Sequence, residues 1–226
     1  MVDISTQHAI GALVGAAVGD ALGAPFEFTP LAGEYTAAFP EPVLGGRGEM
    51  TGGRGWAPGE FTDDTQMALC LAESLLACDG FDADDLWVRW VAWARVAADV
   101  GNQTRAVLRS ASHEGAAERE HLRTGRSAGN GSVMRNTPVA LWTAGRSLDE
   151  MVELAGAQAR LTHHDEHNAF AAAIHAGMVR AGIHGRDVFA AIDEVLGVLP
   201  SAAAERWTDL LAPTYEPEPG TSNGGV

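Results

Sequence analysis

The chain has 226 residues and a mass of 23.6 kDa, enough to bury a core without disulfides or metal staples. Hydrophobic residues make up 46% and charged residues 20%, which excludes a wholly disordered protein. Asp and Glu number 30 against 15 Lys and Arg, and this net charge of -15 opposes binding to duplex nucleic acid, which relies on cations at the phosphates. Small anionic ligands remain compatible where metal ions or helix N-termini supply positive potential.

The N-terminal residues and the cysteines predict a cytoplasmic protein without a membrane partner. Met1–Ala9 contains no Lys or Arg, so the charged start of a secretory signal is missing. The apolar run Ile10–Ala24 contains Asp20 and is shorter than the ~20 residues that cross a bilayer. Cys70 and Cys78 fall in one predicted helix, about 12 Å apart, too far to form a disulfide.

Helical periodicity begins near the N-terminus. The first predicted helix, Gln7–Gly23, has glycine at every fourth position from Gly11, which places the glycines on nearly one face and predicts close packing of another backbone there. Thr29–Gly59 holds many glycines and prolines and is predicted to be a long irregular loop. A second helix is expected to start after Thr62, whose hydroxyl would cap it, and to end at Gly80.

Asp82 is placed to cap the next helix, whose apolar face includes Trp87 and Trp90. Further helices are predicted over Thr104–Ser112, Val133–Thr143, Leu148–Leu161, Glu166–Ala181, Gly185–Leu196 and Ala202–Leu211. The alternation of apolar and polar residues that is typical of strands is almost absent, and alanine, which favours helices, is abundant. The sequence therefore predicts an all-α protein with one domain over residues 1–212 and a loop or disordered tail over residues 213–226.

Carboxylates at three places along the chain are candidates for chemistry. Thr62, Asp63 and Asp64 put a hydroxyl beside two carboxylates at a helix start, a set of hard oxygen ligands that suits Mg²⁺. The same residues equally suit a helix cap, which taken alone is the commoner use. Asp99 is either an acid or base in a cleft or a helix cap, and Glu27 lies just beyond a helix end.

Two further segments are candidates for ligand binding. Gly129-Asn130-Gly131 precedes a predicted helix, so its backbone N–H groups could hold phosphate or ribose oxygens, or form a tight turn. His163 and His167 are four residues apart and could share one helix face as a metal pair, although clustered histidines at a helix start are more often surface or capping groups.

In chain order, these motifs resemble the ADP-ribosylglycohydrolase family. They are Gly-Asp-Ala-Leu-Gly with a later Glu, Thr-Asp-Asp-Thr, Asp-Val-Gly-x-x-Thr, Gly-Asn-Gly-Ser-x-Met-Arg and Leu-Thr-His, between about Gly11 and Arg180. The family includes hydrolases that release ADP-ribose from arginine of dinitrogenase reductase, and ADP-ribosyl-acceptor hydrolases. The resemblance implies an orthogonal helical bundle with two Mg²⁺ ions in a cleft, replaceable by Mn²⁺. It also implies hydrolysis of the bond between ribose and a protein side chain, arginine above all, with an ADP-ribosylated protein or ADP-ribose as partner.

The resemblance also assigns roles to individual residues. The implied metal ligands are Thr62, Asp63 and Asp64. The implied catalytic carboxylates are Glu27, which orients or deprotonates water, and Asp99, which acts as acid or base or faces the guanidinium. The implied ADP-ribose-binding residues are Gly101, Ser127, Gly129, Asn130, Gly131 and His163.

One part of the family pattern has no counterpart. Family members carry a later Asp-x-Asp-Thr motif that completes the metal site, and none follows Asp64 in this sequence. The sequence is therefore also compatible with an inactive fragment or a non-catalytic ADP-ribose-binding descendant, which would bind ADP-ribose in EDTA without turnover. A third interpretation is an all-α metal-dependent phosphohydrolase that uses His163, His164 and Asp165 around a transition metal.

Overall fold

The computed structural model describes residues 6–27, 50, 52–53 and 55–215. The helices of this part are α1 Thr6–Gly23, η1 Ala24–Phe26, α3 Asp63–Ala77, α4 Ala83–Ala94, α5 Asn102–Val107, α6 Ala116–Thr124, η2 Asn130–Ser132, α7 Thr137–Trp142, α8 Leu148–Arg160, α9 Glu166–Ile183, α10 Ala190–Leu196 and α11 Ser201–Leu210. Among these residues, extended pairing is limited to an isolated bridge between Gly53 and Trp56. The all-α prediction is confirmed.

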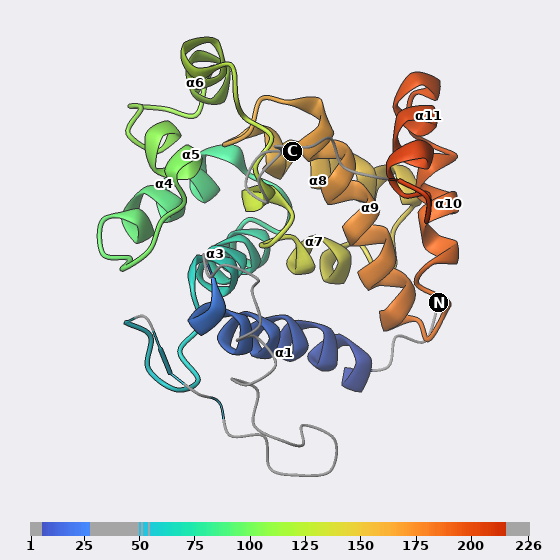
Figure 1. Cartoon of the computed structure of the whole chain (residues 1–226), viewed down its shortest axis with the longest axis horizontal. Helices are drawn as coiled ribbons and strands as arrows, with labels where there is room; N and C mark the ends of the chain where they lie inside the picture. The colour runs from blue at the N-terminus through green and yellow to red at the C-terminus, as the bar shows by residue number, and fades with distance from the viewer. Residues whose placement is uncertain (1–5, 28–49, 51, 54, 216–226) are drawn as a thin grey trace.

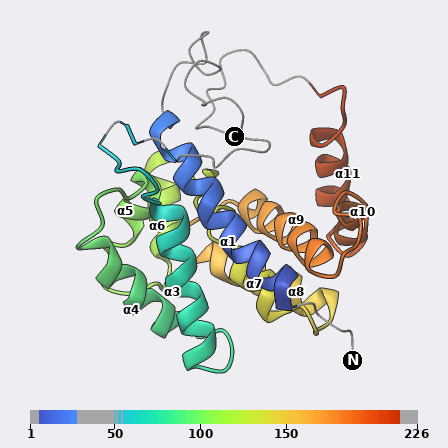
Figure 2. The ribbon, with the colours of Figure 1, turned by 90° about the horizontal axis from the view of Figure 1, so that it is seen from below.

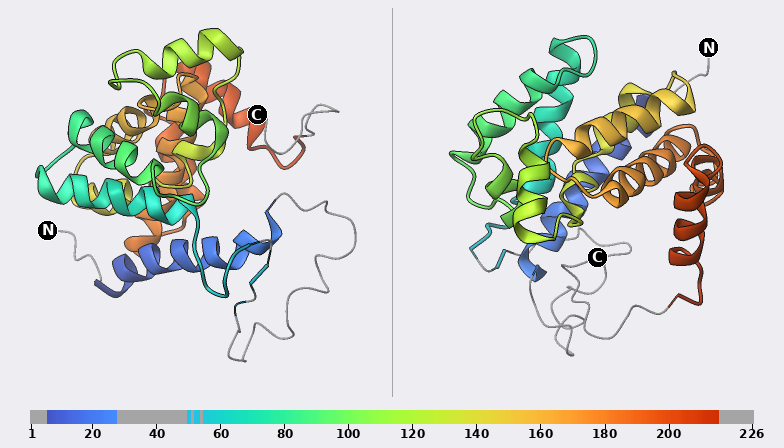
Figure 3. Two further views of the ribbon diagram at one scale, coloured as in Figure 1. Left: turned by 90° about the vertical axis from the view of Figure 1, so that its left-hand side faces the viewer. Right: turned by 90° about the horizontal axis from the view of Figure 1, so that it is seen from above.

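The helices cross one another in two groups that meet at α7. In Figure 1, α3 to α6 lie on one side, α8 to α11 lie on the other, and α7 lies between them. Seen from below in Figure 2, α1 runs diagonally across this assembly, and it packs against α3, α7 and α9. Figure 3 shows α10 and α11 at the outer edge, beyond α9. The C-terminal end of α1 meets the start of α3, where Asp20 bonds to Thr62 and Thr65.

The core is built from one stripe of α3 and from small residues between α8 and α9. Met67, Leu71 and Leu75 recur at intervals of four on α3 and are all buried. Trp90 of α4 is fully buried, and its indole N–H donates to the Met67 carbonyl at 3.3 Å. The packed face of α8 and α9 is mostly alanine, at Ala155, Ala159, Ala169, Ala172, Ala173 and Ala176. These short side chains let the two helices approach closely over their length.

The glycine face of α1 does not meet another backbone within the described residues. A Cβ atom built at Gly11, Gly15, Gly19 or Gly23 would find nothing within 4 Å. The prediction of close packing at the glycines is therefore wrong for this part of the chain. The helix is held elsewhere, through buried Ala21 and through hydrogen bonds of the Asp20 carboxylate to α3.

The segment formed by α1 and η1 is long and apolar enough, by length and composition, to cross a membrane. Thr6–Phe26 comprises 21 residues with a mean hydropathy of 1.5, and most of it is not buried in the described structure. The helix is longer than the run Ile10–Ala24, so the expectation that this region is too short to cross a bilayer is wrong. In this structure, α3, α7 and α9 pack against it, as they would on a helix of a globular fold.

Three predicted helices are shorter than expected, and one helix was not predicted. Because Pro138 sits in its first turn, α7 begins at Thr137 and not at Val133. The predicted Thr104–Ser112 helix ends at Val107, and α10 begins only at Ala190. The polar sequence of α6 gave no apolar periodicity, but left-handed glycines bracket it at Gly115 (φ 63°) and Gly125 (φ 67°). Most of the predicted loop over 29–59 and the tail from 216 lie outside the described residues.

Candidate active site

The start of α3 is held by a carboxylate from α1. Asp20 accepts hydrogen bonds from the backbone N–H groups of Thr62 and Thr65, each at 3.0 Å. It also accepts from their hydroxyl groups, at 2.8 Å for Thr62 and 2.6 Å for Thr65. Thr62 occupies the N-cap position as predicted, but its side chain makes no capping bond, because its hydroxyl donates to Asp20. The cap of α3 therefore comes from another helix, which fixes the positions of Asp63 and Asp64.

Five carboxylates gather around this helix start, and we call them the acidic cluster: Asp20, Glu27, Asp63, Asp64 and Asp99. Burial, followed by the charges of Asp20 and Asp63, raises the pKa of Asp64 to about 7. Burial also raises the pKa of Asp63, and burial with the charge of Asp99 raises the pKa of Glu27. These three pKa shifts have the same causes, burial first and the charges of neighbouring carboxylates second.

The acidic cluster fits a hard divalent cation by the chemistry of its donors. Its side chains offer carboxylate oxygens, and Thr62 adds a hydroxyl, the ligand types that Mg²⁺ prefers. The Gly101 N–H donates to Asp63 Oδ2 at 3.2 Å, which orients one of these carboxylates. Among the described residues, no three His, Cys, Asp or Glu side chains are grouped as a ready-made metal cage. The described residues therefore offer at most part of a coordination sphere, in which Asp63 and Asp64 would be the ligands.

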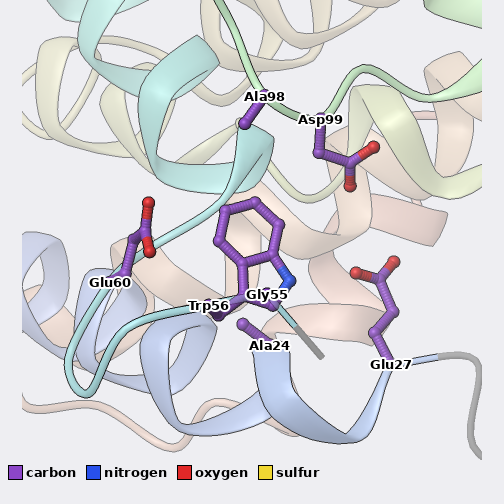
Figure 4. A pocket seen from close by; sticks show the side chains of 7 residues that line it. All are labelled: Ala24, Glu27, Gly55, Trp56, Glu60, Ala98 and Asp99. Carbon is purple, nitrogen blue, oxygen red and sulfur yellow. The ribbon is translucent and has the colours of Figure 1, made fainter. Parts of the chain in front are cut away.

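A pocket of about 430 Å³ opens beside Glu27 and Asp99. Its lining residues are Ala24, Glu27, Gly55, Trp56, Glu60, Ala98 and Asp99. In Figure 4, the Trp56 indole occupies the centre, with the carboxylates of Glu27 and Asp99 on one side and that of Glu60 on the other. Both predicted catalytic carboxylates are thus brought to one pocket. The alternative interpretation of Asp99 as the cap of α5 is wrong, because Gly101 holds the N-cap position.

His163 lies against the glycine-rich segment that was predicted to bind ADP-ribose. The side chain is buried, and a Cβ atom built on Gly131 would lie 2.9 Å from its Cε1 atom. A Cβ atom on Gly129 would lie 3.8 Å from its Nε2 atom, an ordinary contact. The structure therefore brings these three predicted residues together. However, Asn130–Ser132 forms a short 3-10 helix, so the expectation that this segment leads directly into an α-helix is wrong.

A chain of hydrogen bonds sets the orientation of His163. Arg135 is fully buried, and its guanidinium donates to Gln158 and to the Thr162 hydroxyl oxygen at 2.8 Å. The Thr162 hydroxyl lies 2.8 Å from His163 Nδ1, and because its oxygen accepts from Arg135, its hydrogen is available for that nitrogen. Burial and the charge of Arg135 lower the pKa of His163 to about 3, so the ring is neutral at pH 7. The proton of the neutral ring then belongs on Nε2, the nitrogen nearest Gly129.

The other predicted binding residues differ in their surroundings. Ser127 is buried, and its hydroxyl bonds to His121 Nδ1 at 2.7 Å and accepts from the Asp165 N–H at 3.1 Å. These partners give it a role in holding its own loop, so ligand contact by its side chain stays a prediction. Asn130 is exposed, and its carbonyl accepts from the N–H groups of Val133 and Met134.

The histidines do not form the metal pair that their spacing suggested. His163 precedes α9, which begins at Glu166, so His163 and His167 do not share a helix face. Asp165 caps α9 by accepting from the His167 N–H at 2.9 Å, and His164 packs against the His121 ring with centroids 5.0 Å apart. These contacts give the segment a structural role, which weakens the phosphohydrolase interpretation.

Sequence reasoning assigned no role to four residues that shape the site. Asp20 is a charged residue within the apolar α1, and Arg135 is the last residue of the Gly-Asn-Gly-Ser-x-Met-Arg motif. Both features could have identified these residues as candidates from the sequence. Trp56 and Glu60 lie in a glycine-rich stretch, where periodicity gives no information about side-chain direction. Their place in the pocket depends on a turn that only the structure shows.

Comparisons with known proteins relate the chain to ADP-ribosyl hydrolases. The ADP-ribosylglycohydrolase family profile matches residues 1–223. ADP-ribosyl-(dinitrogen reductase) glycohydrolase of Rhodospirillum rubrum is 38% identical over 192 residues, covering 83% of this chain and 62% of the relative. ADP-ribosylarginine hydrolase Tri1 of Serratia proteamaculans is 32% identical over 169 residues, covering 70% of this chain and 43% of the relative.

A solved structure supports the same assignment. A chain described as belonging to an ADP-ribosylglycohydrolase-related protein complex aligns with a TM-score of 0.63 and 35% identity. The alignment covers 86% of this chain and 64% of the solved one. Across these comparisons, the chain spans between 43% and 64% of the length of its relatives. The extent of the family match shows that the chain belongs to the ADP-ribosylglycohydrolase family.

Proposed function

We propose that this chain is a Mg²⁺-dependent hydrolase that releases ADP-ribose from ADP-ribosylated proteins, with arginine as the modified side chain. The observation that carries the proposal is the pocket beside the acidic cluster, where Glu27 and Asp99 line one space and Asp63 is tied to Gly101. Two relatives are named for hydrolysis of ADP-ribosyl bonds, on dinitrogen reductase and on arginine. Both names agree with a site built for this class of bond.

Asp63 and Asp64 would hold the metal ions, together with the Thr62 hydroxyl. Bound Mg²⁺ would polarise ribose hydroxyls and lower the pKa of water at the site. We expect two such ions, for which Mn²⁺ would substitute. Their positive charge would also offset the negative charge of the chain, -15 in total, which otherwise repels a diphosphate. Burial raises the pKa values of Asp63 and Asp64, and neighbouring carboxylates raise them further; a bound cation would offset this second cause.

The reaction breaks the bond between the ribose anomeric carbon and a guanidine nitrogen, and water supplies the oxygen that replaces it. Glu27 would orient this water and accept its proton, since its pKa is raised by burial and by Asp99. Asp99 would face the departing guanidine and hold the proton that this group needs to leave. His163, as a neutral donor at Nε2, would bind a diphosphate or ribose oxygen beside Gly129 and Gly131.

Release of ADP-ribose from a modified protein tests this proposal. Proteins modified on arginine and on serine are incubated with the chain in Mg²⁺ or in EDTA, and ADP-ribose is measured by chromatography, with Asp63→Ala alongside. Release from the arginine substrate that needs Mg²⁺ and is lost in the variant is the expected result. Release in EDTA, or equal release by the variant, contradicts the proposed metal dependence.

One structural feature favours a second candidate, an ADP-ribose-binding protein without turnover. Within the described residues, no three His, Cys, Asp or Glu side chains group as a complete metal cage. This candidate predicts ADP-ribose binding that persists in EDTA, with no release from either substrate. The same assay, combined with calorimetry of ADP-ribose binding, separates the two.

A further inference from the structure

The pocket beside the acidic cluster is suited to a cation and unsuited to the ADP part of a substrate. Three of its lining side chains are carboxylates, from Glu27, Glu60 and Asp99, and no Lys or Arg is found among the described residues that line it. A diphosphate placed there would be repelled. A cation would be attracted by the carboxylates, and the face of the Trp56 indole would add a cation–π contact.

The Trp56 backbone is fixed by a tight turn. Gly53 and Trp56 exchange two backbone hydrogen bonds, at 3.0 and 2.9 Å. A Cβ atom on Gly52 would lie 2.6 Å from the Trp56 carbonyl oxygen and 2.9 Å from Pro58 Cδ, so the turn closes only over a glycine. A Cβ atom on Gly53 would lie 3.3 Å from Pro25, which shows that the turn packs onto η1. The backbone that carries Trp56 is therefore held against the short helix that Glu27 follows.

The carboxylate of Glu60 is also held in place. Its Oε2 atom accepts from the Ala57 N–H at 2.7 Å, and its own N–H donates to the Ala57 carbonyl at 3.0 Å. This pair of bonds turns the side chain back toward the Trp56 turn. Figure 4 shows the Glu60 carboxylate across the indole from Glu27 and Asp99.

The pocket and the predicted ADP-ribose residues are both linked to Asp63 through one segment of the chain. The Gly101 N–H bonds to Asp63, and the chain continues through α5 to Thr104, whose hydroxyl lies 3.4 Å from a Cβ position on Gly131. Two residues before Gly101, Asp99 lines the pocket together with Trp56. A substrate with its ribose at the acidic cluster would thus have Gly131 available for its diphosphate and the Trp56 pocket available for its acceptor side chain.

We infer that Trp56 and Glu60 form the acceptor subsite of this protein, binding the planar guanidinium of the modified arginine. The indole stacks on the guanidinium, and the Glu60 carboxylate accepts hydrogen bonds from the guanidinium N–H groups that point away from ribose. Asp99 faces the guanidinium nitrogen that is bonded to ribose. A guanidinium suits this pocket because it is flat, weakly hydrated and rich in N–H donors. The inference rests on the proposed function for the identity of the substrate, but the pocket's preference for guanidinium can be measured without turnover.

Binding of methylguanidine to the full chain tests the subsite directly. Ligand-observed NMR would compare methylguanidine with urea, a neutral planar analogue of similar size. Methylguanidine is expected to bind and urea is not. Trp56→Ala is expected to weaken methylguanidine binding about tenfold, with Trp56→Phe intermediate, and Glu60→Gln to weaken it several-fold. Glu118→Gln, on the surface of α6, is the matched control and should leave binding unchanged.

Kinetics separate this inference from the proposed function. For an arginine-linked substrate, Trp56→Ala should raise KM about tenfold while kcat changes little. If the chain releases no ADP-ribose but still binds methylguanidine through Trp56, the proposed function fails and the cation subsite stands. Equal binding of methylguanidine by the wild type and Trp56→Ala overturns the subsite, whatever the hydrolytic activity. Thermal unfolding of each variant identifies those that fail to fold, and Trp56→Phe keeps the test valid if Trp56→Ala is among them.

Discussion

Asp20 and Thr65 link α1 to the first turn of α3 by two hydrogen bonds, 2.6 Å from the Thr65 hydroxyl and 3.0 Å from its N–H. A helix cap supplied from 45 residues away in sequence joins two elements and positions the carboxylates between them. Capping normally adds local stability to one helix. Here the capping residue lies in the acidic cluster, so the stability of α3 and the affinity for cations should respond to the same substitution.

Replacement of Asp20 by alanine should lower both stability and cation affinity. Loss of the cap is expected to cost about 1–2 kcal/mol in the free energy of unfolding, measured by urea denaturation. Asp82 is a matched control, since it caps α4 by accepting from the Asp85 N–H at 2.9 Å and lies outside the acidic cluster. Asp82→Ala should cost about 1 kcal/mol and leave Mn²⁺ affinity unchanged. A similar loss of Mn²⁺ affinity in both variants would contradict the link between cap and cluster.

The metal-free protein should lose stability as the pH rises. The pKa of Asp64 is raised from 3.8 to about 7 by burial and neighbouring carboxylates, so between these values the folded state retains a proton that the unfolded state has released. The free energy of unfolding in EDTA should therefore fall across this interval, as urea denaturation at several pH values can measure. Asp64→Asn should flatten the decline. An identical pH dependence in the variant and the wild type would show that Asp64 is not the responsible group.

A methyl group at Gly131 should disturb His163, whereas one at Gly129 should not. The Cβ atom of Gly131→Ala would lie 2.9 Å from His163 Cε1, which forces the ring to move and should cost about 1–3 kcal/mol of stability. Gly129→Ala introduces a contact of 3.8 Å, which is ordinary van der Waals packing. Calorimetry should show weaker ADP-ribose binding for Gly131→Ala alone. Equal binding by both variants would remove His163 from the ligand site.

Arg135 should not be replaceable by lysine. Its guanidinium donates to Gln158 and Thr162 and lies 3.9 Å from the Trp90 ring centroid, an arrangement that a single ammonium cannot reproduce. Arg135→Lys is expected to lower the free energy of unfolding by about 2–4 kcal/mol in urea denaturation. Arg123→Lys, at an exposed pair with Glu120, is the control and should change it by less than about 0.5 kcal/mol. A small effect at both positions would show that the buried guanidinium is not needed.

Much of the fold follows from local patterns, and the exceptions have physical causes. The helices at Asp63–Ala77 and Leu148–Arg160 have clear apolar stripes, and Ser147 and Glu150 form a capping box at the start of the second, so local patterns predict both helices closely. The helix Ala116–Thr124 is polar and depends on its bracketing glycines and its packing on α5. Pro138 delays the start of α7 by four residues relative to the apolar pattern.

The motifs of the site could be found in the sequence, but the arrangement of their side chains in space could not. Asp63, Asp99 and Glu27 stand far apart in sequence, and ordered motifs rather than spacing suggested that they meet. The cap from Asp20 and the place of Trp56 in the pocket arise from tertiary contacts that no window of sequence contains. His163 was assigned to the ligand site by its motif, whereas its neutral state depends on burial and on Arg135.

Binding of Mn²⁺ to the full chain tests most directly whether the acidic cluster is a metal site. Mn²⁺ is titrated with the wild type, Asp63→Asn and Asp82→Ala, and the free ion is followed by electron paramagnetic resonance. Two bound ions in the wild type and in Asp82→Ala, with at least one lost in Asp63→Asn, is the predicted result. Binding by Asp63→Asn that matches the wild type would contradict the account, because the carboxylate at the centre of the cluster would then hold no metal.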